Sequence, residues 1–242
     1  MRKKYNIAII FAGGTGQRMN TQGIPKQFLK LHSKPIIIYT LEQFEQNELI
    51  DAIIVVCIES GIGYLQELIK NYGLKKVVSI IPGGSSGQES IYNGLQEAER
   101  LYSGESIVLI HDGVRPIIDD KTIMANIQCT KENGNSITVV KATETIVLAK
   151  KAEITSILKR EDCLIARAPQ SFLLKDIISA HRMAQKEGYK EAVDSAMLMK
   201  HYGYKLHCVE GKPENIKITT PSDFYVFRAY IDAKENAQIL GL

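Results

Sequence analysis

The sequence predicts an α/β fold in which a mainly parallel sheet is flanked by helices and carries one projecting β-arm. Three observations lead to this prediction. Short apolar runs typical of buried strands alternate with longer segments of helical period. The first run, residues 7–11, opens directly onto a glycine-rich turn. Residues 141–160 then break the alternation with two short β-like runs.

The expected elements follow from these apolar runs and from the turn residues between them. The expected strands cover residues 7–11, 52–58, 77–81, 107–110, 136–140 and 204–209. The expected helices cover residues 35–46, 61–72, 90–100, 121–133, 174–187, 192–202 and 222–235. No internal repeat or low-complexity linker divides the chain, so residues 1–242 are predicted to form one domain.

The predicted arm lies within residues 141–160. Its two β-like runs, residues 145–149 and 154–158, are joined by a charged turn. A two-stranded hairpin is marginal by itself and needs a further surface to cover it. Either a second subunit or the arm's own domain could provide that surface.

Composition limits the kinds of protein this chain can be. Of its 242 residues, 45% are hydrophobic and 24% charged, as in soluble globular proteins. The net charge of +3 and the lack of like-charge runs give no support for a nucleic-acid partner. No segment reaches the roughly 20 apolar residues of a membrane span. The scattered cysteines and the short first apolar run favour a cytoplasmic protein without disulfides or structural zinc.

The glycine-rich turn after the first strand is suited to a polyanion. Gly13, Gly14 and Gly16 allow backbone N–H groups to approach a phosphate, and Arg18 and Lys26 add positive charge. The segment lacks the lysine of a Walker A loop, and it lacks the third glycine of the dinucleotide fingerprint. The alternative is an ordinary strand-to-helix turn with solvated charges.

Several motifs in this order resemble the nucleotidyltransferases that activate polyol phosphates with CTP. They are GGTGQRM at 13–19, PKQFL at 25–29, HDGVRP at 111–116, APQ at 168–170 and ENIKIT at 214–219. The family's two main branches are the methylerythritol-phosphate and the ribitol-5-phosphate cytidylyltransferases. The resemblance spans about residues 6–227 and implies a Rossmann-like nucleotidyltransferase sheet. It also implies a homodimer in which the 141–160 arm embraces the partner.

The implied reaction transfers CMP from CTP to the phosphate of the acceptor. That phosphate is largely ionised at pH 7, so no general base is needed. The site must instead offset repulsion between anions and hold the attacking and leaving groups in line. Cations, backbone N–H groups and a divalent ion meet this need.

The resemblance assigns the triphosphate to one group of residues. Ala12, Gly13, Gly14, Thr15 and Gly16 would wrap the triphosphate, while Arg18, Lys26 and Lys217 would act as the catalytic cations. Lys217 could otherwise be a solvated lysine at a strand end.

A second group of expected site residues follows the strand at 107–110. Asp112 is predicted to contact Mg²⁺ beside the nucleotide, with Gly113 and Arg115 also in the nucleotide site. The alternative is a structural pair between Asp112 and Arg115 at a turn. No chemistry is assigned to His111.

A glycine- and serine-rich loop aligns with the family's pyrimidine-reading segment. Gly84, Ser85 and Ser90 are expected to read the cytosine edge, although Ser90 could instead cap a helix. The loop departs from the family pattern at two positions. An acidic residue is common at Ser85, and an arginine is usual at Gly87.

The acceptor is assigned to Arg160, at the base of the arm, and to Asp194. Ala168 and Val193 replace threonines that the family usually has, which favours an acceptor other than methylerythritol phosphate. We therefore expect a CDP-polyol-forming enzyme, with ribitol-5-phosphate as the main candidate, for cell-surface polymer synthesis. The alternatives are methylerythritol-phosphate activation for isoprenoid precursors and a non-catalytic nucleotide-binding regulator.

Overall fold

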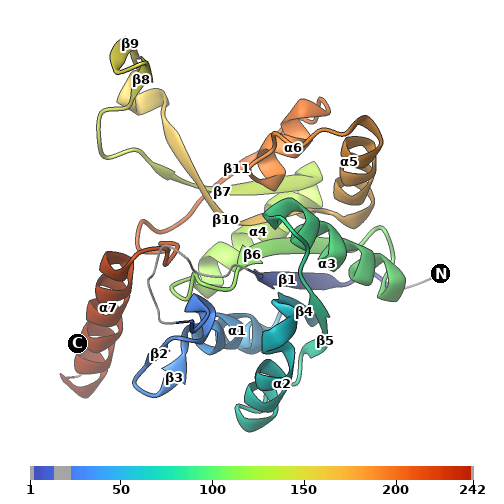
Figure 1. Ribbon diagram of the computed structural model, residues 1–242, viewed down its shortest axis with the longest axis vertical. Coiled ribbons are helices and arrows are strands. Elements are labelled where there is room, and N and C mark those ends of the chain that lie inside the picture. The colour runs from blue at the N-terminus through green and yellow to red at the C-terminus, as the bar shows by residue number, and fades with distance from the viewer. Residues whose placement is uncertain (1–2, 14–22, 241–242) are drawn as a thin grey trace.

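A computed structural model describes residues 3–13 and 23–240. Its centre is a seven-stranded sheet with strand order β11-β7-β10-β6-β1-β4-β5 (Figure 1). The strands are β1 (Asn6–Ala12), β4 (Ala52–Cys57), β5 (Val77–Pro82), β6 (Ile107–Asp112), β7 (Asn135–Lys141), β10 (Leu164–Leu173) and β11 (Cys208–Glu210). In this sheet β10 runs antiparallel to both of its neighbours, and the other pairings are parallel. The predicted, mainly parallel sheet is confirmed.

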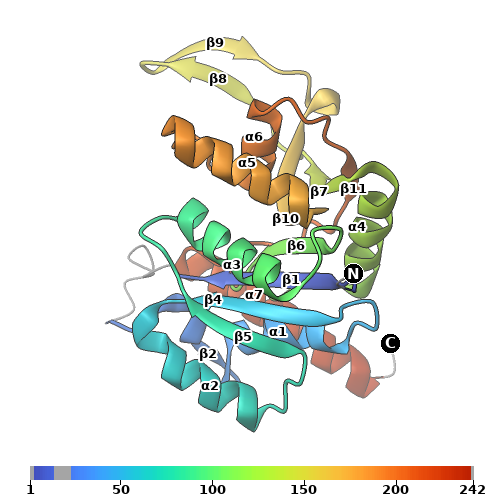
Figure 2. The ribbon, with the colours of Figure 1, turned by 90° about the vertical axis from the view of Figure 1, so that its right-hand side faces the viewer.

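Helices cover both faces of the sheet (Figure 2). One face packs against α3 (Gly87–Leu101), α5 (Leu174–Glu187) and α6 (Ser195–His201), and the other against α1 (Ile36–Gln46), α2 (Ile62–Asn71) and α4 (Asp120–Asn133). On β1, Ile9 faces the first group and Ile10 the second, and both are fully buried. Burial on both faces explains why the strands appear in the sequence as continuous apolar runs.

The C-terminal helix α7 (Pro221–Leu240) packs outside these two layers. Phe227 lies with Ile36, Val114 and Ile218 in a separate buried cluster. A two-stranded ribbon of β2 (Lys30–Leu31) and β3 (Lys34–Pro35) adds Leu31 to the same cluster. This packing ties the chain's last segment to the turn that follows β6.

Two helices begin three residues away from their predicted starts, because a side chain ahead of them caps the helix. Helix α3 begins at Gly87, since the Ser86 hydroxyl accepts a hydrogen bond from the Glu89 N–H. Ser90 lies inside the helix, so its alternative role as a helix cap was wrong. Helix α6 begins after Asp194, whose carboxylate accepts from the Met197 N–H.

Strand β10 was not predicted. Its sequence, LIARAPQSFL, carries a proline in its middle, and prolines are normally confined to strand edges and bulges. Here Pro169 lies within a register shift between β10 and β7, where the ladder is irregular. The strand predicted for 204–209 is shorter and later, forming β11.

The predicted arm is present as a hairpin of β8 (Val147–Lys150) and β9 (Glu153–Ile157), which projects from the sheet in Figure 1. Every residue of both strands is exposed, including Leu148 at 50% and Ile154 at 58%. In the described structure these strands pair with each other and with no other strand. The hairpin therefore does not fold back on its own domain.

The four cysteines are free, and Cys57 is buried within β4 as expected for a small apolar side chain. Among the described helices, none has the length and apolar character needed to cross a bilayer.

Candidate functional site

The candidate site lies where the parallel strands β1, β5 and β6 end. Gly13 directly follows β1, and Gly83 directly follows β5. A Cβ added to Gly83 would lie 3.0 Å from the Ser90 hydroxyl oxygen and 3.6 Å from the Gly13 Cα. The close approach of these glycines places the start of the predicted triphosphate loop (residues 12–16) beside the loop predicted to read the cytosine base (residues 83–90), called the base loop below.

The base loop is held by side chains of α3. The Ser90 hydroxyl accepts from the Gly84 N–H at 3.0 Å and donates to the Ser86 carbonyl at 2.9 Å. Both the N–H and the hydroxyl of Ser85 donate to the Glu89 carboxylate. These hydrogen bonds lower the pKa of Glu89, so its carboxylate is ionised in the loop at neutral pH. Ser90 and Glu89 thus fix the loop's shape.

A cluster of three charged side chains lies at the end of β6. One Asp112 oxygen accepts from Lys217 Nζ at 2.6 Å, and the other accepts from Arg115 Nε at 2.7 Å. Arg115 also donates to the carbonyl of Asn215 at 2.9 Å. Burial alone would raise the pKa of Asp112, but the two cations outweigh it and lower this pKa to about 2. Asp112 is therefore an ionised carboxylate inside the protein.

The PKQFL motif contacts the same region from the other side. Lys26 Nζ donates to the Ile218 carbonyl at 3.3 Å, so Lys26 lies beside the segment that carries Lys217. The buried Gln27 side chain donates to the Ala12 carbonyl at 2.7 Å and secures the end of β1. The Gly113 carbonyl accepts from the Thr40 hydroxyl at 3.0 Å. The sequence alone indicated no role for Gln27, although this residue lies inside the PKQFL motif.

Four predicted residues of the glycine-rich loop lie outside the described residues: Gly14, Thr15, Gly16 and Arg18. Their assignments remain predictions.

A cavity of about 200 Å³ opens beside the charged cluster, and Asp112, Arg115 and Lys217 line it. The predicted acceptor positions Ala168, Val193 and Asp194 line it as well. Ala168 and Val193 therefore face the same space as Arg115 and Lys217. Arg167 and Gln170 also line this cavity, and both were missed because β10 was not recognised as a strand.

Asp194 is held in place by protein donors. One of its oxygens caps α6 by accepting from the Met197 N–H at 2.8 Å. The other accepts from the Gln170 amide at 2.9 Å, while the Gln170 carbonyl oxygen accepts from the Ala196 N–H. This network links β10 rigidly to the start of α6.

Arg160 lies apart from the cavity within a single chain. It is exposed at the base of the arm, where it donates to the Thr143 carbonyl at 3.4 Å, and it does not line the cavity.

His111 is fully buried, and its Nε2 lies 3.1 Å from the Arg115 carbonyl. Burial lowers the pKa of His111 to about 4, so the ring is neutral at pH 7 and supports the turn.

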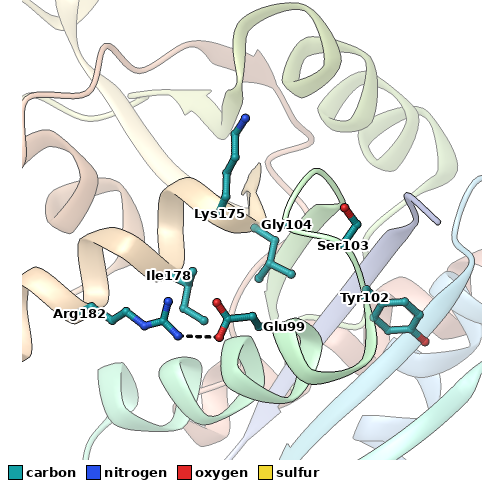
Figure 3. A pocket seen from close by; sticks show the side chains of 8 residues that line it. Glu99, Tyr102, Ser103, Gly104, Lys175, Ile178 and Arg182 are labelled. Atoms are coloured by element: carbon teal, nitrogen blue, oxygen red, sulfur yellow. Dashed lines mark hydrogen bonds and ion pairs between the residues drawn. The ribbon is translucent and has the colours of Figure 1, made fainter. Parts of the chain in front are cut away.

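A larger cavity of about 410 Å³, shown in Figure 3, lies at the opposite edge of the sheet. Ser103 and Gly104, just ahead of β6, line it together with an ion pair between Glu99 and Arg182 at 2.6 Å. The candidate site lies at the C-terminal ends of β1, β5 and β6, whereas this cavity lies at the N-terminal end of β6. The cavity is therefore separate from the candidate site. Another cavity, of about 730 Å³, lies between the base loop and helices α5 and α6.

Comparisons with known proteins agree with this geometry. Residues 6–233 match the family described as IspD, 2-C-methyl-D-erythritol 4-phosphate cytidylyltransferase. A ribitol-5-phosphate cytidylyltransferase of Streptococcus agalactiae serotype V is 50% identical, and the alignment covers 98% of this chain and 99% of that protein. A 2-C-methyl-D-erythritol 4-phosphate cytidylyltransferase of Clostridium novyi is 40% identical, with 90% and 93% covered.

The fold is also similar to solved structures. The 4-diphosphocytidyl-2C-methyl-D-erythritol synthase of Anaerococcus prevotii aligns with a TM-score of 0.83 at 23% identity, covering 95% of this chain and 96% of that one. The Francisella tularensis 2-C-methyl-D-erythritol 4-phosphate cytidylyltransferase aligns with a TM-score of 0.75 at 28% identity, covering 92% and 97%. Sequence, fold and the site at the strand ends thus agree, and the chain belongs to the IspD family of cytidylyltransferases.

Proposed function

We propose that this protein transfers CMP from CTP to the phosphate of ribitol-5-phosphate, forming CDP-ribitol and releasing pyrophosphate. The observation that supports the proposal is the charged cluster of Asp112, Arg115 and Lys217 at the end of β6. Arg115 and Lys217 are held on the ionised Asp112, with Lys26 anchored beside them on Ile218. Arg115 and Lys217 share a cavity with Phe11 and Gly87, which adjoin or lie in the loops that the resemblance assigns to the nucleotide.

In this reaction an oxygen of the acceptor phosphate attacks the α-phosphorus of CTP. The bond from that phosphorus to the bridging oxygen breaks, and the electron pair leaves with pyrophosphate. Lys26, Lys217 and Arg18 would offset the repulsion between the two anions and stabilise the charge on the α-phosphate. The N–H groups of Gly84 and Ser85 are bonded to Ser90 and Glu89, so the carbonyl groups of this segment would accept from the cytosine amino group, and CTP should be preferred over UTP.

Asp112 has the chemistry of a Mg²⁺ ligand. Its pKa of about 2 keeps it ionised, and each carboxylate oxygen can accept from more than one direction. Mg²⁺ commonly binds one or two carboxylates together with phosphate oxygens and water. The bound ion would neutralise charge on the triphosphate. With CTP present, Mg²⁺ should raise the melting temperature of the wild type and have little effect on Asp112→Asn.

The choice of ribitol-5-phosphate is supported by sequence identity and by the cavity. The ribitol-5-phosphate relative is 50% identical, against 40% for the methylerythritol-phosphate relative. Ala168 and Val193, which line the cavity, stand where the resemblance places threonines. Methylerythritol phosphate remains the second candidate, because it is the substrate named for the matching family.

We further propose a cytoplasmic homodimer joined through the arm. The exposed faces of β8 and β9 carry Val147, Leu148, Ile154 and Ile157, each more than 40% exposed. An exposed apolar hairpin gains stability when a second subunit covers it. A partner's arm would also bring Arg160 toward a cavity that it does not reach within its own chain.

A pyrophosphate-release assay tests the proposed function. The purified protein is incubated with Mg²⁺, CTP and one acceptor: ribitol, methylerythritol, arabinitol or mannitol phosphate. We expect the highest kcat/KM with ribitol-5-phosphate, and little turnover when ATP replaces CTP. Highest activity with methylerythritol phosphate would support the second candidate. Nucleotide binding without turnover on any acceptor would favour a non-catalytic regulator.

A further inference from the structure

Arg167 lies at the irregular part of β10. Ala166 pairs with Val139 and Gln170 pairs with Ile137, so four residue steps on β10 correspond to two on β7. Such bulges redirect side chains and are common beside active sites. In this segment Arg167 and Ala168 both line the cavity next to the charged cluster.

The guanidinium of Arg167 has no acidic partner among the described residues. Its Nε is buried and has no hydrogen-bond acceptor. The two carboxylates that line the cavity are already engaged: Asp112 by Arg115 and Lys217, and Asp194 by Gln170 and the start of α6. Burial and the nearby Arg115 lower the pKa of Arg167. A buried donor without a partner carries a free-energy cost that a ligand can remove.

The cavity as a whole has a surplus of positive charge. Three basic side chains line it, Arg115, Arg167 and Lys217, against the two carboxylates of Asp112 and Asp194. A polyol chain is neutral and would not balance this surplus, whereas a phosphate monoester would. The planar fork of arginine also matches two phosphate oxygens at once.

We propose that Arg167 binds the phosphate of the acceptor in the cavity of its own subunit and helps select phosphorylated polyols. This inference rests on the proposed function. Arg167 is thus a second acceptor-binding arginine, fixed on the central sheet, whereas Arg160 lies on the arm. The polyol chain would then lie toward Ala168, Val193 and Ser195, which line the same cavity.

The test compares Arg167→Gln and Arg167→Lys with the wild type. Arg182→Gln is the matched control, because it removes an arginine from the cavity at the opposite edge. Both Arg167 variants should raise the KM for ribitol-5-phosphate, by roughly 10-fold to 150-fold for the glutamine, the scale for a lost hydrogen bond to a charged group. The KM for CTP should change by less than about twofold, whereas a merely structural role would alter both.

Inorganic phosphate provides a readout that does not depend on the polyol. It should inhibit the wild type competitively against ribitol-5-phosphate, and its inhibition constant should rise in Arg167→Gln in parallel with the acceptor KM. Arg167→Lys keeps a positive charge on β10 and is the more conservative variant. Melting curves of both variants would show whether they are folded. An unchanged acceptor KM in folded variants, or equal increases for both substrates, would overturn the inference. Failure of the wild type to use any polyol phosphate would instead refute the proposed function.

Discussion

Lys217 Nζ lies 2.6 Å from Asp112 Oδ1, which joins the C-terminal part of the chain to the end of strand β6. The adjacent N–H of Ile218 donates to the Val114 carbonyl at 2.9 Å and fixes the backbone beside this ion pair. The buried Asn215 adds a third link by donating to the Ala168 carbonyl at 2.8 Å. Segments far apart in the sequence therefore meet around one carboxylate.

Asp112→Asn should lower the free energy of unfolding at pH 7 by on the order of 2 kcal/mol. The reason is that the folded pKa of about 2 lies below the ordinary value of 3.8. A lowered carboxyl pKa stabilises the fold above about pH 4, and this stabilisation disappears as the pH falls toward 2. Urea unfolding at several pH values should therefore show the difference between wild type and variant narrowing from pH 4 to 2.

Glu99→Gln serves as the control for this measurement. Glu99 pairs with Arg182, but their side chains are 39% and 54% exposed, so solvent screens the pair and the change in stability should stay below about 1 kcal/mol. Equal effects for the two variants would show that the buried cluster contributes no special stability.

Lys26→Ala should reduce kcat by roughly 10²–10³, the scale for removing one donor that stabilises the transition state. The KM for CTP should change less, because other backbone groups would still hold the triphosphate. Lys175→Ala is a suitable control, since that amine pairs with the exposed Glu105 at the opposite edge of the sheet. Steady-state kinetics with near-normal turnover in Lys26→Ala would remove this lysine from the mechanism.

Gly84→Ala should raise the KM for CTP and leave the acceptor KM nearly unchanged. A Cβ at Gly84 would lie 2.6 Å from the Glu89 Cβ, so Glu89 must move away from Ser85 and the base loop must change shape. Gly87→Ala is the matched control, because a Cβ there meets nothing within 4 Å. The same CTP affinity in both variants, measured by calorimetry, would show that the loop's shape does not govern nucleotide binding.

Deletion of residues 144–158 should convert the protein to monomers, because it removes the exposed apolar strands of the arm. Sedimentation should report the change in mass, and CTP should still bind at the strand ends. Acceptor turnover should fall sharply, since Arg160 would no longer reach a partner's cavity. A deletion variant that remains dimeric and active would show that the arm has no part in assembly.

Arg160→Ala separates assembly from binding. The dimer should persist, and the KM for the acceptor should rise while the KM for CTP changes little. Equal effects on both substrates would place Arg160 outside the acceptor site.

The sequence was sufficient to predict most of the fold and much of the site. Continuous apolar runs such as 52–58 have no polar alternation, which identifies strands buried on both faces. The family resemblance placed Asp112, Arg115 and Lys217 in one site, and these three residues do lie together. Capping was harder to predict, since Ser86 and Ser90 are both plausible caps and the loop geometry decides between them.

Strand β10 and its side chains could not be predicted for a different reason. Pro169 argues against a central strand unless a bulge is known, and a bulge depends on pairing with distant β7. Without the strand, nothing in the sequence indicates that Arg167 faces a cavity. The engagement of both Asp112 oxygens likewise depends on contacts between distant segments.

The position of Lys217 has a consequence for how the protein is made. During synthesis the N-terminal part of the chain emerges first, and β1 and β6 can form before the C-terminal segment leaves the ribosome. Until then Asp112 lacks one of its two cations, and the cluster around Phe227 is open. A nascent chain that has reached β6 but not Lys217 therefore holds Asp112 without the complete charged cluster, which can form only after residue 217 has been synthesised.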